Sequence, residues 1–272
     1  MNKTQSGFIN NHYNGRRESY LILGENDSKW DKVLLGRMAW PDAEESISKA
    51  RGIILPLGST EQHGYHMAAA TDTVISEYVC GELAIRTNCL VLPALPYGQV
   101  WSAKGFPATI SLRQRTFIEV VKDIVVSLEE QKARNVILFS GHYGNMQPSK
   151  DAARELFDEY GYRNVWNLGY TSVDKLNKAI MQTTLWNGKT FHAAELETSL
   201  MLHIAPNLVK LHKAVGENPE IPPDIDLRPI PWKEYSKIGV FGDPAKATAE
   251  KGAEFLKAWL DILCDIVQKN IL

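Results

Sequence analysis

Short apolar runs alternate along the chain with longer stretches that carry an apolar stripe on one helical face. The apolar runs, which predict buried strands, are Gly52–Leu57, Cys89–Leu92, Val136–Ser140 and Asn164–Leu168. The stretches that predict helices between them are Thr73–Arg86, Arg115–Gln131 and Lys150–Tyr160. Strands that alternate with helices favour parallel βαβ units. We therefore expect an α/β fold, namely a single-domain three-layer sandwich with a mostly parallel central sheet flanked by helices.

Three segments do not follow this alternation. Residues 1–50 are polar and aromatic-bearing without clear periodicity, so we expect an N-terminal extension that packs on the core or on a neighbouring subunit. Gly216–Trp232 is rich in proline and acid and cannot be a regular helix. It is expected to lie over the active site or at a subunit contact, or else to be an ordinary surface connection. Gly242-Asp243-Pro244 predicts an N-cap with proline at the first position of a helix that packs on the sheet.

A carboxylate, an imidazole and a second carboxylate surround the loop after the first predicted strand. Glu61 and His63 lie in Gly58-Ser59-Thr60-Glu61-Gln62-His63-Gly64, and Asp72 follows nine residues after the histidine. In an extended backbone, residues two apart point to the same side, so Glu61 and His63 can reach one point in space. These are ligand types that a divalent metal prefers. The alternative is that Asp72 only caps the next helix and the other two are solvated loop residues.

Two further segments carry histidines in similar positions. His142 lies in Gly141-His142-Tyr143-Gly144-Asn145, directly after the predicted strand Val136–Ser140. The ligand crevice of an open α/β sheet lies outside the carboxyl ends of its strands, so His142 is a natural further ligand. Residues 191–202 look helical, and His192 and Glu195, at a spacing of three, would share a face of that helix. Three such segments together indicate a metal site.

The combined motifs carry a family resemblance. GSTEQHG at 58–64, TDT at 71–73, FPATISL at 106–112, GHYGN at 141–145, HAAELETS at 192–199 and GDPAKATAEKG at 242–252 resemble the creatininase (creatinine amidohydrolase) family. The resemblance implies a metal hydrolase domain over residues 51–272 that holds one or two divalent ions (Zn, Mn or Fe), in a homo-oligomer such as a hexamer. It also implies that Glu61, His63, Asp72 and His142 are ligands, with Asp72 as the bridge, and that His192 is an acid or base beside the ions.

The chain departs from the creatininase pattern within the predicted site. Creatininase has a glutamate in its His-Tyr-Glu-Asn motif where this chain has Gly144, which removes one ligand of the second ion. Glu195 is predicted to replace it as the neighbour of His192, with Glu197 as the less favoured candidate. Tyr143 matches the tyrosine of that motif and is predicted to be catalytic together with His192. Other changes in the presumed pocket argue against creatinine itself as the substrate.

Hydrolysis is the chemistry that follows from such a site. Two cations bridged by a carboxylate lower the pKa of a shared water from about 16 to near 7, so that a bridging hydroxide is available to attack a carbonyl carbon. We predict that the C–N bond of a small cyclic amide is opened, and His192 passes a proton to the departing atom. The alternatives are cleavage of a C–C bond in a cyclic polyol ketone of the dehydro-inosose type and a non-catalytic metal-binding protein. Trp101 and Trp186 are predicted either to stack on the substrate or to be core or interface residues.

Composition narrows the partners and the location. The formal net charge is only -2 and there is no extended basic block, so neither nucleic acid nor an anionic membrane is expected as a partner. A hydrophobic fraction of 44% supports a sizeable core. The three cysteines form no CxxC pair, and no apolar run approaches the length of a membrane span. A cytoplasmic protein is therefore expected.

Overall fold

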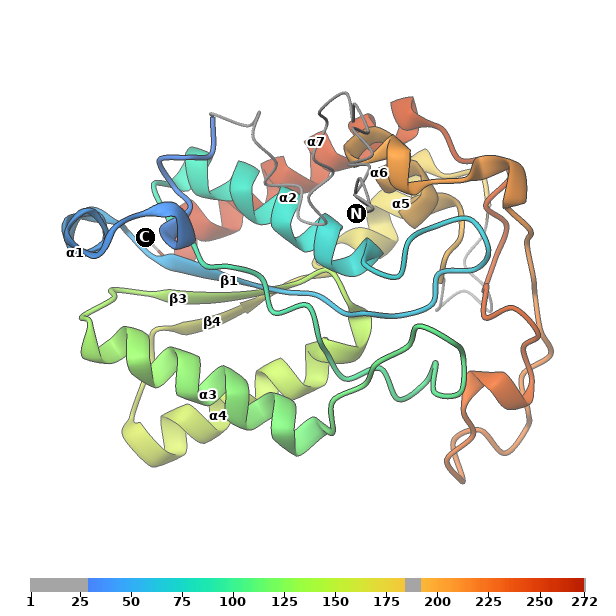
Figure 1. Ribbon diagram of the computed structural model, residues 1–272, viewed down its shortest axis with the longest axis horizontal. Helices are drawn as coiled ribbons and strands as arrows, with labels where there is room; N and C mark the ends of the chain where they lie inside the picture. The colour runs from blue at the N-terminus through green and yellow to red at the C-terminus, as the bar shows by residue number, and fades with distance from the viewer. Residues whose placement is uncertain (1–28, 184–191, 272) are drawn as a thin grey trace, which may run out of the picture.

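The computed structural model describes residues 29–183 and 192–271, and it contains one parallel sheet (Figure 1). The strands are β1 (Ile53–Leu57), β2 (Leu90–Val91), β3 (Val136–Ser140) and β4 (Val165–Leu168). They lie in the order β2-β1-β3-β4, and each neighbouring pair is parallel. The predicted α/β class is confirmed, and the sheet is parallel throughout the described strands rather than mostly so.

Helices cover both faces of the sheet. They are α1 (Trp40–Lys49), α2 (Thr71–Thr87), α3 (Gln114–Glu130), α4 (Met146–Tyr160), α5 (Val173–Ile180), α6 (Glu195–Ile204) and α7 (Ala249–Ile266). In Figure 1, α3 and α4 lie below the sheet, and α2, α5, α6 and α7 lie above it. Each helix layer shares a separate apolar cluster with one face of the sheet. These are the three layers expected from the alternating pattern.

The two central strands are apolar on both faces, as strands buried between two helix layers must be. In β1, Ile53, Leu55 and Leu57 belong to the apolar cluster that the sheet shares with α3 and α4. Ile54 belongs to the cluster on the opposite face, which the sheet shares with α2 and α7. The five residues of β1 pair in register with the five of β3, from Ile53 opposite Val136 to the two carboxyl-terminal residues. The loops that leave β1 and β3 therefore begin side by side.

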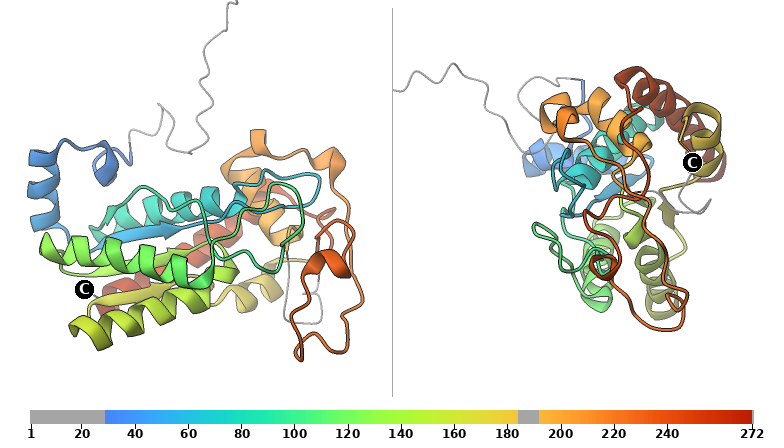
Figure 2. Two further views of the ribbon diagram at one scale, coloured as in Figure 1. Left: turned by 60° about the horizontal axis from the view of Figure 1, so that its bottom comes forward. Right: turned by 90° about the vertical axis from the view of Figure 1, so that its right-hand side faces the viewer.

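Those two loops then diverge to opposite faces of the sheet. The chain continues from β1 into α2 above the sheet and from β3 into α4 below it (Figure 1). In open α/β sheets this switch of direction opens a crevice at the carboxyl ends of the strands, where ligands bind. The long segment between α6 and α7 also lies at this end of the molecule (Figure 2). The fold thus gathers three segments that are distant in sequence around one crevice.

Residues 29–50 pack on the same core. Trp30 is fully buried, and its Nε1 donates a hydrogen bond to Glu82 Oε1 at 3.0 Å on α2. Ile47 of α1 belongs to the apolar cluster under α3 and α4. The rest of the predicted N-terminal extension, residues 1–28, lies outside the described residues. Contact with a neighbouring subunit and the division of the chain at residue 50 stay predictions.

The start of the last long helix differs from the sequence prediction. α7 begins at Ala249, and its N-cap is Thr248, whose side chain accepts a hydrogen bond from the backbone N–H of Lys251. The predicted N-cap, Asp243, instead accepts from Ala245 N–H at 2.9 Å and closes a local turn. Short acidic side chains serve turns and caps equally well, so the motif alone could not decide between them. No helix in the described parts of the chain is long and apolar enough to cross a membrane.

Candidate metal centre

The loop after β1 turns two buried side chains toward the crevice. Glu61 and His63 are each 1% exposed. The N–H of Glu61 donates to Ala69 O at 2.9 Å, which ties the loop to the segment before α2. His63 Nδ1 lies 3.1 Å from Glu61 O, so Nδ1 can donate its hydrogen to that carbonyl, and Nε2 would be the nitrogen that offers a lone pair to an ion. That Nε2 lies 3.1 Å from Asp72 Oδ1.

Asp72 lies in the first turn of α2 but does not cap it. The N-cap is Ala70, and no side chain caps this helix. Asp72 is 2% exposed, and its Oδ2 accepts a hydrogen bond from Ser59 Oγ at 2.6 Å. Burial acts to raise the pKa of Asp72, but the neighbouring His63 and His142 hold that pKa well below its usual range. The simple capping role is thereby wrong, and the carboxylate faces the two histidines.

His142 reaches the same point from the end of β3. Its Nε2–H donates to the backbone carbonyl of Gln99 at 2.8 Å, which leaves Nδ1 as the lone pair. Nδ1 lies 2.8 Å from Asp72 Oδ2 and 3.1 Å from Glu61 Oε2. Glu61 Oε2 is buried, and despite this short distance it makes no hydrogen bond of acceptable geometry within the described chain. Burial acts to lower the pKa of His142, but Glu61 and Asp72 hold that pKa well above its usual value, so without an ion a proton on Nδ1 is shared with these carboxylates. A cation that displaced this proton would meet three donor atoms that converge on one point.

Glu197, and not Glu195, joins this group. Glu195 was predicted as the replacement ligand, but its carboxylate accepts from the backbone N–H groups of Gln182 and Thr183 and pairs with Lys251 Nζ at 2.5 Å. Glu197 Oε2 lies 4.0 Å from His63 Nε2. The donor atoms of Glu197, His63 and Asp72 all lie within 4.8 Å of one another, close enough to bind one ion. The Glu195 prediction is therefore corrected by the geometry.

The cause of the error is where α6 begins. The prediction assumed one helix through His192 and Glu195, but α6 starts at Glu195 and Ala194 is its N-cap. His192 is paired instead with Phe241 in an antiparallel bridge. Ala193, which follows His192 in the chain, has a left-handed backbone conformation with φ 51°. The shared helical face on which the spacing argument depended does not exist.

Gly144 explains why no glutamate occupies the position found in creatininase. A Cβ built at Gly144 would lie well under 3.0 Å from Gln99 O and from His142 Nε2. Contacts that short displace the backbone or break the hydrogen bond that orients the His142 ring. In this chain the carboxylate that lies near His63 and Asp72 comes from another element, at Glu197 of α6.

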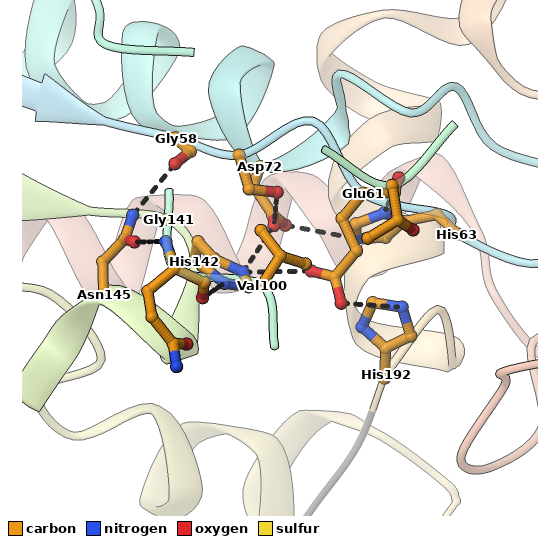
Figure 3. Close-up of polar contacts among 12 residues, drawn as sticks. Gly58, Glu61, His63, Asp72, Val100, Gly141, His142, Asn145 and His192 are labelled. Atoms are coloured by element: carbon orange, nitrogen blue, oxygen red, sulfur yellow. Dashed lines mark hydrogen bonds and ion pairs between the residues drawn. The ribbon is translucent and has the colours of Figure 1, made fainter. Parts of the chain in front are cut away.

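The donor atoms form two overlapping groups that share Asp72. Glu61, Asp72 and His142 make one triad, and His63, Asp72 and Glu197 make the other; the atoms of each lie within 4.8 Å of one another. Figure 3 shows Asp72 between the two histidines, with Glu61 facing His142. The set combines carboxylate oxygens and imidazole nitrogens, which suits zinc or manganese.

The three buried carboxylates of the donor group favour a bound cation. Glu61, Asp72 and Glu197 are all buried, and within the described chain no lysine or arginine forms an ion pair with any of them. Burial, followed by repulsion from Asp72 and Glu61, raises the pKa of Glu197 to about 7 despite the opposing His63. Burial acts to lower the pKa of His63, but Asp72, Glu197 and Glu61 raise it to about 10. Divalent cations would balance these carboxylates directly.

His192 lies beside the donors but is oriented differently. Its Nε2–H donates to the backbone carbonyl of Gln62 at 2.8 Å, and Nε2 is 3.9 Å from Glu61 Oε1. His192 with Glu61 and His63 forms a third possible ligand group by distance alone. Nε2, the ring nitrogen that lies near Glu61, already donates to Gln62 O, so it has no lone pair to offer an ion at that point. Burial is the main cause that lowers the pKa of His192 to about 4, so the imidazole is neutral at neutral pH.

A cavity of about 430 Å³ opens onto the donors. Its wall includes Tyr143, which is 74% exposed, and Trp232, whose ring centroid lies 4.9 Å from that of His192. Trp101, predicted either to stack on substrate or to be a core or interface residue, does not line this cavity, although its neighbours Val100 and Ser102 do. This favours the second alternative for Trp101, which stays a prediction. Trp186 lies outside the described residues.

Trp232 and the Gln99 carbonyl contact the histidines of the site and were missed by the sequence prediction. A backbone carbonyl carries no residue-type signal, so Gln99 could not have been found from the sequence. Trp232 ends Gly216–Trp232, which was expected to lie over the active site as one option. The backbone N–H of Trp232 donates to Ser102 O at 2.7 Å, so this segment is anchored to another residue of the cavity wall. The sequence signal that could have identified Trp232 was an aromatic residue in a segment that was expected, as one option, to lie over the active site.

Known proteins share both the sequence pattern and the length of this chain. The chain is 29% identical over 253 residues to the creatinine amidohydrolase of Pseudomonas putida, covering 88% of this chain and 97% of that protein. It is 29% identical over 244 residues to the mycofactocin precursor peptide peptidase of Mycobacterium ulcerans (84% and 89% covered). It is 26% identical over 260 residues to the 3-dehydro-scyllo-inosose hydrolase of Thermotoga maritima (87% and 83% covered).

Solved structures agree with these relatives. A creatininase mutant of Zn-Zn type has a TM-score of 0.79 and 28% identity, with 88% of this chain and 98% of that chain covered. A manganese creatininase has a TM-score of 0.75 and 30% identity, with the same coverage. The family described as creatinine amidohydrolase matches residues 36–267. Because this match spans the sheet, both helix layers and every donor residue of the centre, the chain belongs to the creatininase family of metal-dependent hydrolases.

Proposed function

We propose that the protein opens the ring of a small cyclic amide by hydrolysis of its C–N bond, with two divalent metal ions. The observation that carries the proposal is Asp72, whose two carboxylate oxygens face two different donor triads. A carboxylate in this position is suited to bridge two ions. A buried donor set used only for structure would not need an adjoining cavity of about 430 Å³.

The proposed ligands follow the two triads. Glu61, Asp72 and His142 would hold one ion, and His63, Asp72 and Glu197 the other. When bound, zinc or manganese ions supply Lewis acidity, which polarises a carbonyl group and makes water a nucleophile at neutral pH. The presence of Glu197 beside His63 and Asp72 weakens the argument for a non-catalytic protein, which was motivated by the glutamate missing at Gly144.

Three side chains around the donors would handle the substrate. The Nε2 hydrogen of His192 is held by Gln62 O, so Nδ1 is the atom that takes up a proton and releases it to the departing nitrogen. Trp232 covers His192 and offers an aromatic face to a planar ring. Tyr143 presents a hydroxyl at the exposed edge of the cavity, where it can donate a hydrogen bond to substrate.

The cavity and the family together define the range of substrates. Its volume falls within the roughly 300–1,000 Å³ of small-molecule sites. Relatives act on creatinine, on a precursor peptide and on a dehydro-inosose, according to their names. A compact cyclic amide fits the enclosed donors better than an extended peptide does. Cytoplasmic location and assembly into a homo-oligomer such as a hexamer stay predictions from the sequence.

Metal content and turnover test the proposal together. The protein is loaded separately with zinc, manganese and iron, and bound metal per chain is measured by mass spectrometry. Hydrolysis is then measured for a panel of creatinine, five- and six-membered cyclic amides, a cyclic polyol ketone and a short peptide. We expect two ions per chain and ring opening of at least one cyclic amide.

Two variants test whether the effect of removing an acidic side chain is specific to the metal site. Asp72→Ala should lose both ions and all turnover, whereas Asp123→Ala, an exposed acid on α3, should keep both. A folded protein that binds no metal after loading would refute the metal centre. Turnover restricted to the polyol ketone or to the peptide would refute the cyclic amide and identify the substrate class in its place.

A further inference from the structure

The charged residues of the cavity wall fall into two groups. The inner group consists of the carboxylates and imidazoles of the donor cluster. The outer group consists of Lys150 and Asp174, both of which are exposed. Lys150 is the one lysine or arginine among the described residues that line this cavity. The function proposed above assigns no role to this outer group.

The helix α4 directs Lys150 toward the site. Met146, four residues earlier on α4, also lines the cavity. Residues four apart lie on the same face of a helix, so the wall position of Lys150 follows from the helix geometry. Tyr143, just before α4, lines the cavity as well. One wall of the cavity therefore carries an ammonium group and a phenol hydroxyl, both of which can donate hydrogen bonds.

The charge of Lys150 is not neutralised within the described chain. Some lysines of the described chain are paired, for example Lys122 with Glu155 at 2.9 Å and Lys251 with Glu195 at 2.5 Å. Lys150 forms no ion pair with any acid that the structure describes, Asp174 included. An unpaired cation at the rim of a cleft attracts anions toward that cleft.

We infer that Lys150 determines specificity by binding an anionic group, a carboxylate, that the substrate carries away from its scissile bond. The inference rests on the proposed hydrolysis of a cyclic amide and adds that the preferred substrates are acidic. Creatinine has no carboxylate, so a preference for acidic rings would separate this enzyme from creatinine hydrolysis. The carboxylate would pair with the Lys150 ammonium by a charge-assisted hydrogen bond.

Asp174 makes the inference sharper because its charge has the opposite sign. It lies in the first turn of α5 and lines the same cavity. A substrate carboxylate held by Lys150 would be repelled by Asp174. Removing each charge should therefore change the affinity for acidic substrates in opposite directions. A purely structural role for either residue predicts no such opposition.

The test uses two rings of nearly equal shape, 5-oxoproline and its uncharged amide, 5-oxoprolinamide. Kinetics and calorimetric binding are measured on the metal-loaded enzyme and on Lys150→Met, Lys150→Arg and Asp174→Asn. Lys178→Met, an exposed lysine on α5 that does not line the cavity, is the matched control. Binding is measured as well as turnover so that a ring that is held but not opened still gives a result.

We expect Lys150→Met to raise KM and Kd for 5-oxoproline about tenfold with little change in kcat, and those for the amide less than twofold. Lys150→Arg should restore most of the affinity. Asp174→Asn should lower KM for 5-oxoproline about twofold to threefold, and Lys178→Met should change nothing.

Equal effects of Lys150→Met on both rings, or no preference of the wild type for the acidic ring in turnover or in binding, would overturn the inference. Turnover of neutral rings without this charge preference would overturn it and leave the proposed hydrolysis intact. Loss of turnover for every ring while the charge preference in binding persists would instead overturn the proposed reaction and support the anion site.

Discussion

Exchanging each of the two glutamates at the start of α6 for glutamine should separate metal binding from fold stability. Glu195 and Glu197 lie two residues apart, which places their side chains about 200° apart around the helix axis. Glu195 faces Lys251 of α7 and the backbone after α5, whereas Glu197 faces His63 and Asp72. The two substitutions are chemically identical and therefore act as controls for each other.

The expected cost of Glu195→Gln follows from its contacts. Its carboxylate is 1% exposed, and the Lys251 side chain is 17% exposed. Removing one partner of a buried ion pair costs about 3–5 kcal/mol, and the partial exposure of Lys251 reduces this to about 2–3 kcal/mol. For a chain of this size that corresponds to a fall in Tm of about 5–10 °C. Metal content should stay at the wild-type level.

Glu197→Gln should have the opposite profile. Loss of a charged donor should weaken binding of the ion held with His63 by about 100-fold or more, since even outer partners of metal ligands contribute 10–100-fold. The metal-free protein should be no less stable than wild type, because the substitution removes a buried negative charge from a cluster of three carboxylates.

Thermal unfolding of the metal-free proteins and metal titration by calorimetry measure the two effects independently. If Glu195→Gln lost an ion and Glu197→Gln retained both, the assignment drawn from the geometry would be wrong and the sequence-based choice would be right. If both variants lost metal equally, the two residues would not be separable in the way their contacts indicate.

Three further outcomes follow from individual contacts. Gly144→Ala should destabilise the protein by about 1–3 kcal/mol and weaken metal binding, because the added methyl group collides with Gln99 O; unfolding in urea measures it. Trp232→Ala should lower kcat/KM about tenfold or more, whereas Trp101→Ala, outside the cavity wall, should change it less than twofold in the same assay. The pKa of Glu195 is lowered by Lys251 and by hydrogen bonds despite its burial, so its contribution to stability is present above the ordinary pKa of 4.5 and is lost as pH falls below it. The difference in unfolding free energy between wild type and Glu195→Gln should therefore be constant above about pH 5 and shrink in more acid solution.

Each outcome has a result that contradicts it. Wild-type stability and metal affinity in Gly144→Ala would mean that the loop carrying Gln99 yields easily. Equal losses in the two tryptophan variants would mean that Trp101 reaches the substrate after all. A stability difference that stays constant down to pH 3 would mean that the Glu195 carboxylate does not titrate with unfolding.

Local pattern was sufficient to predict the parallel sheet and the helices α2, α3 and α4, but not α1 or α5. Each of β1 and β3 is a run of five residues that are all buried, and each apolar stripe on a predicted helix packs on one face of the sheet. Parallel pairing then followed from the alternation of strands with helices. The positions of Glu61, His63 and His142 were predictable for the same reason, because the carboxyl ends of adjacent parallel strands meet at one edge.

The tertiary structure decided what depended on contacts between distant segments. The bridge between His192 and Phe241 holds His192 outside α6, which begins at Glu195, and Glu197 is the glutamate of this helix that lies near His63. No local pattern contains that information, since the bridge joins residues 192 and 241. Trp232 likewise became part of the site only through its backbone bond to Ser102. The amino-acid pattern alone therefore fixed the main strands and helices and the strand ends at which candidate ligands lie. Packing between distant segments fixed which side chains face the metal site. The reason is that the direction of a side chain depends on where its helix or strand starts and how it is anchored.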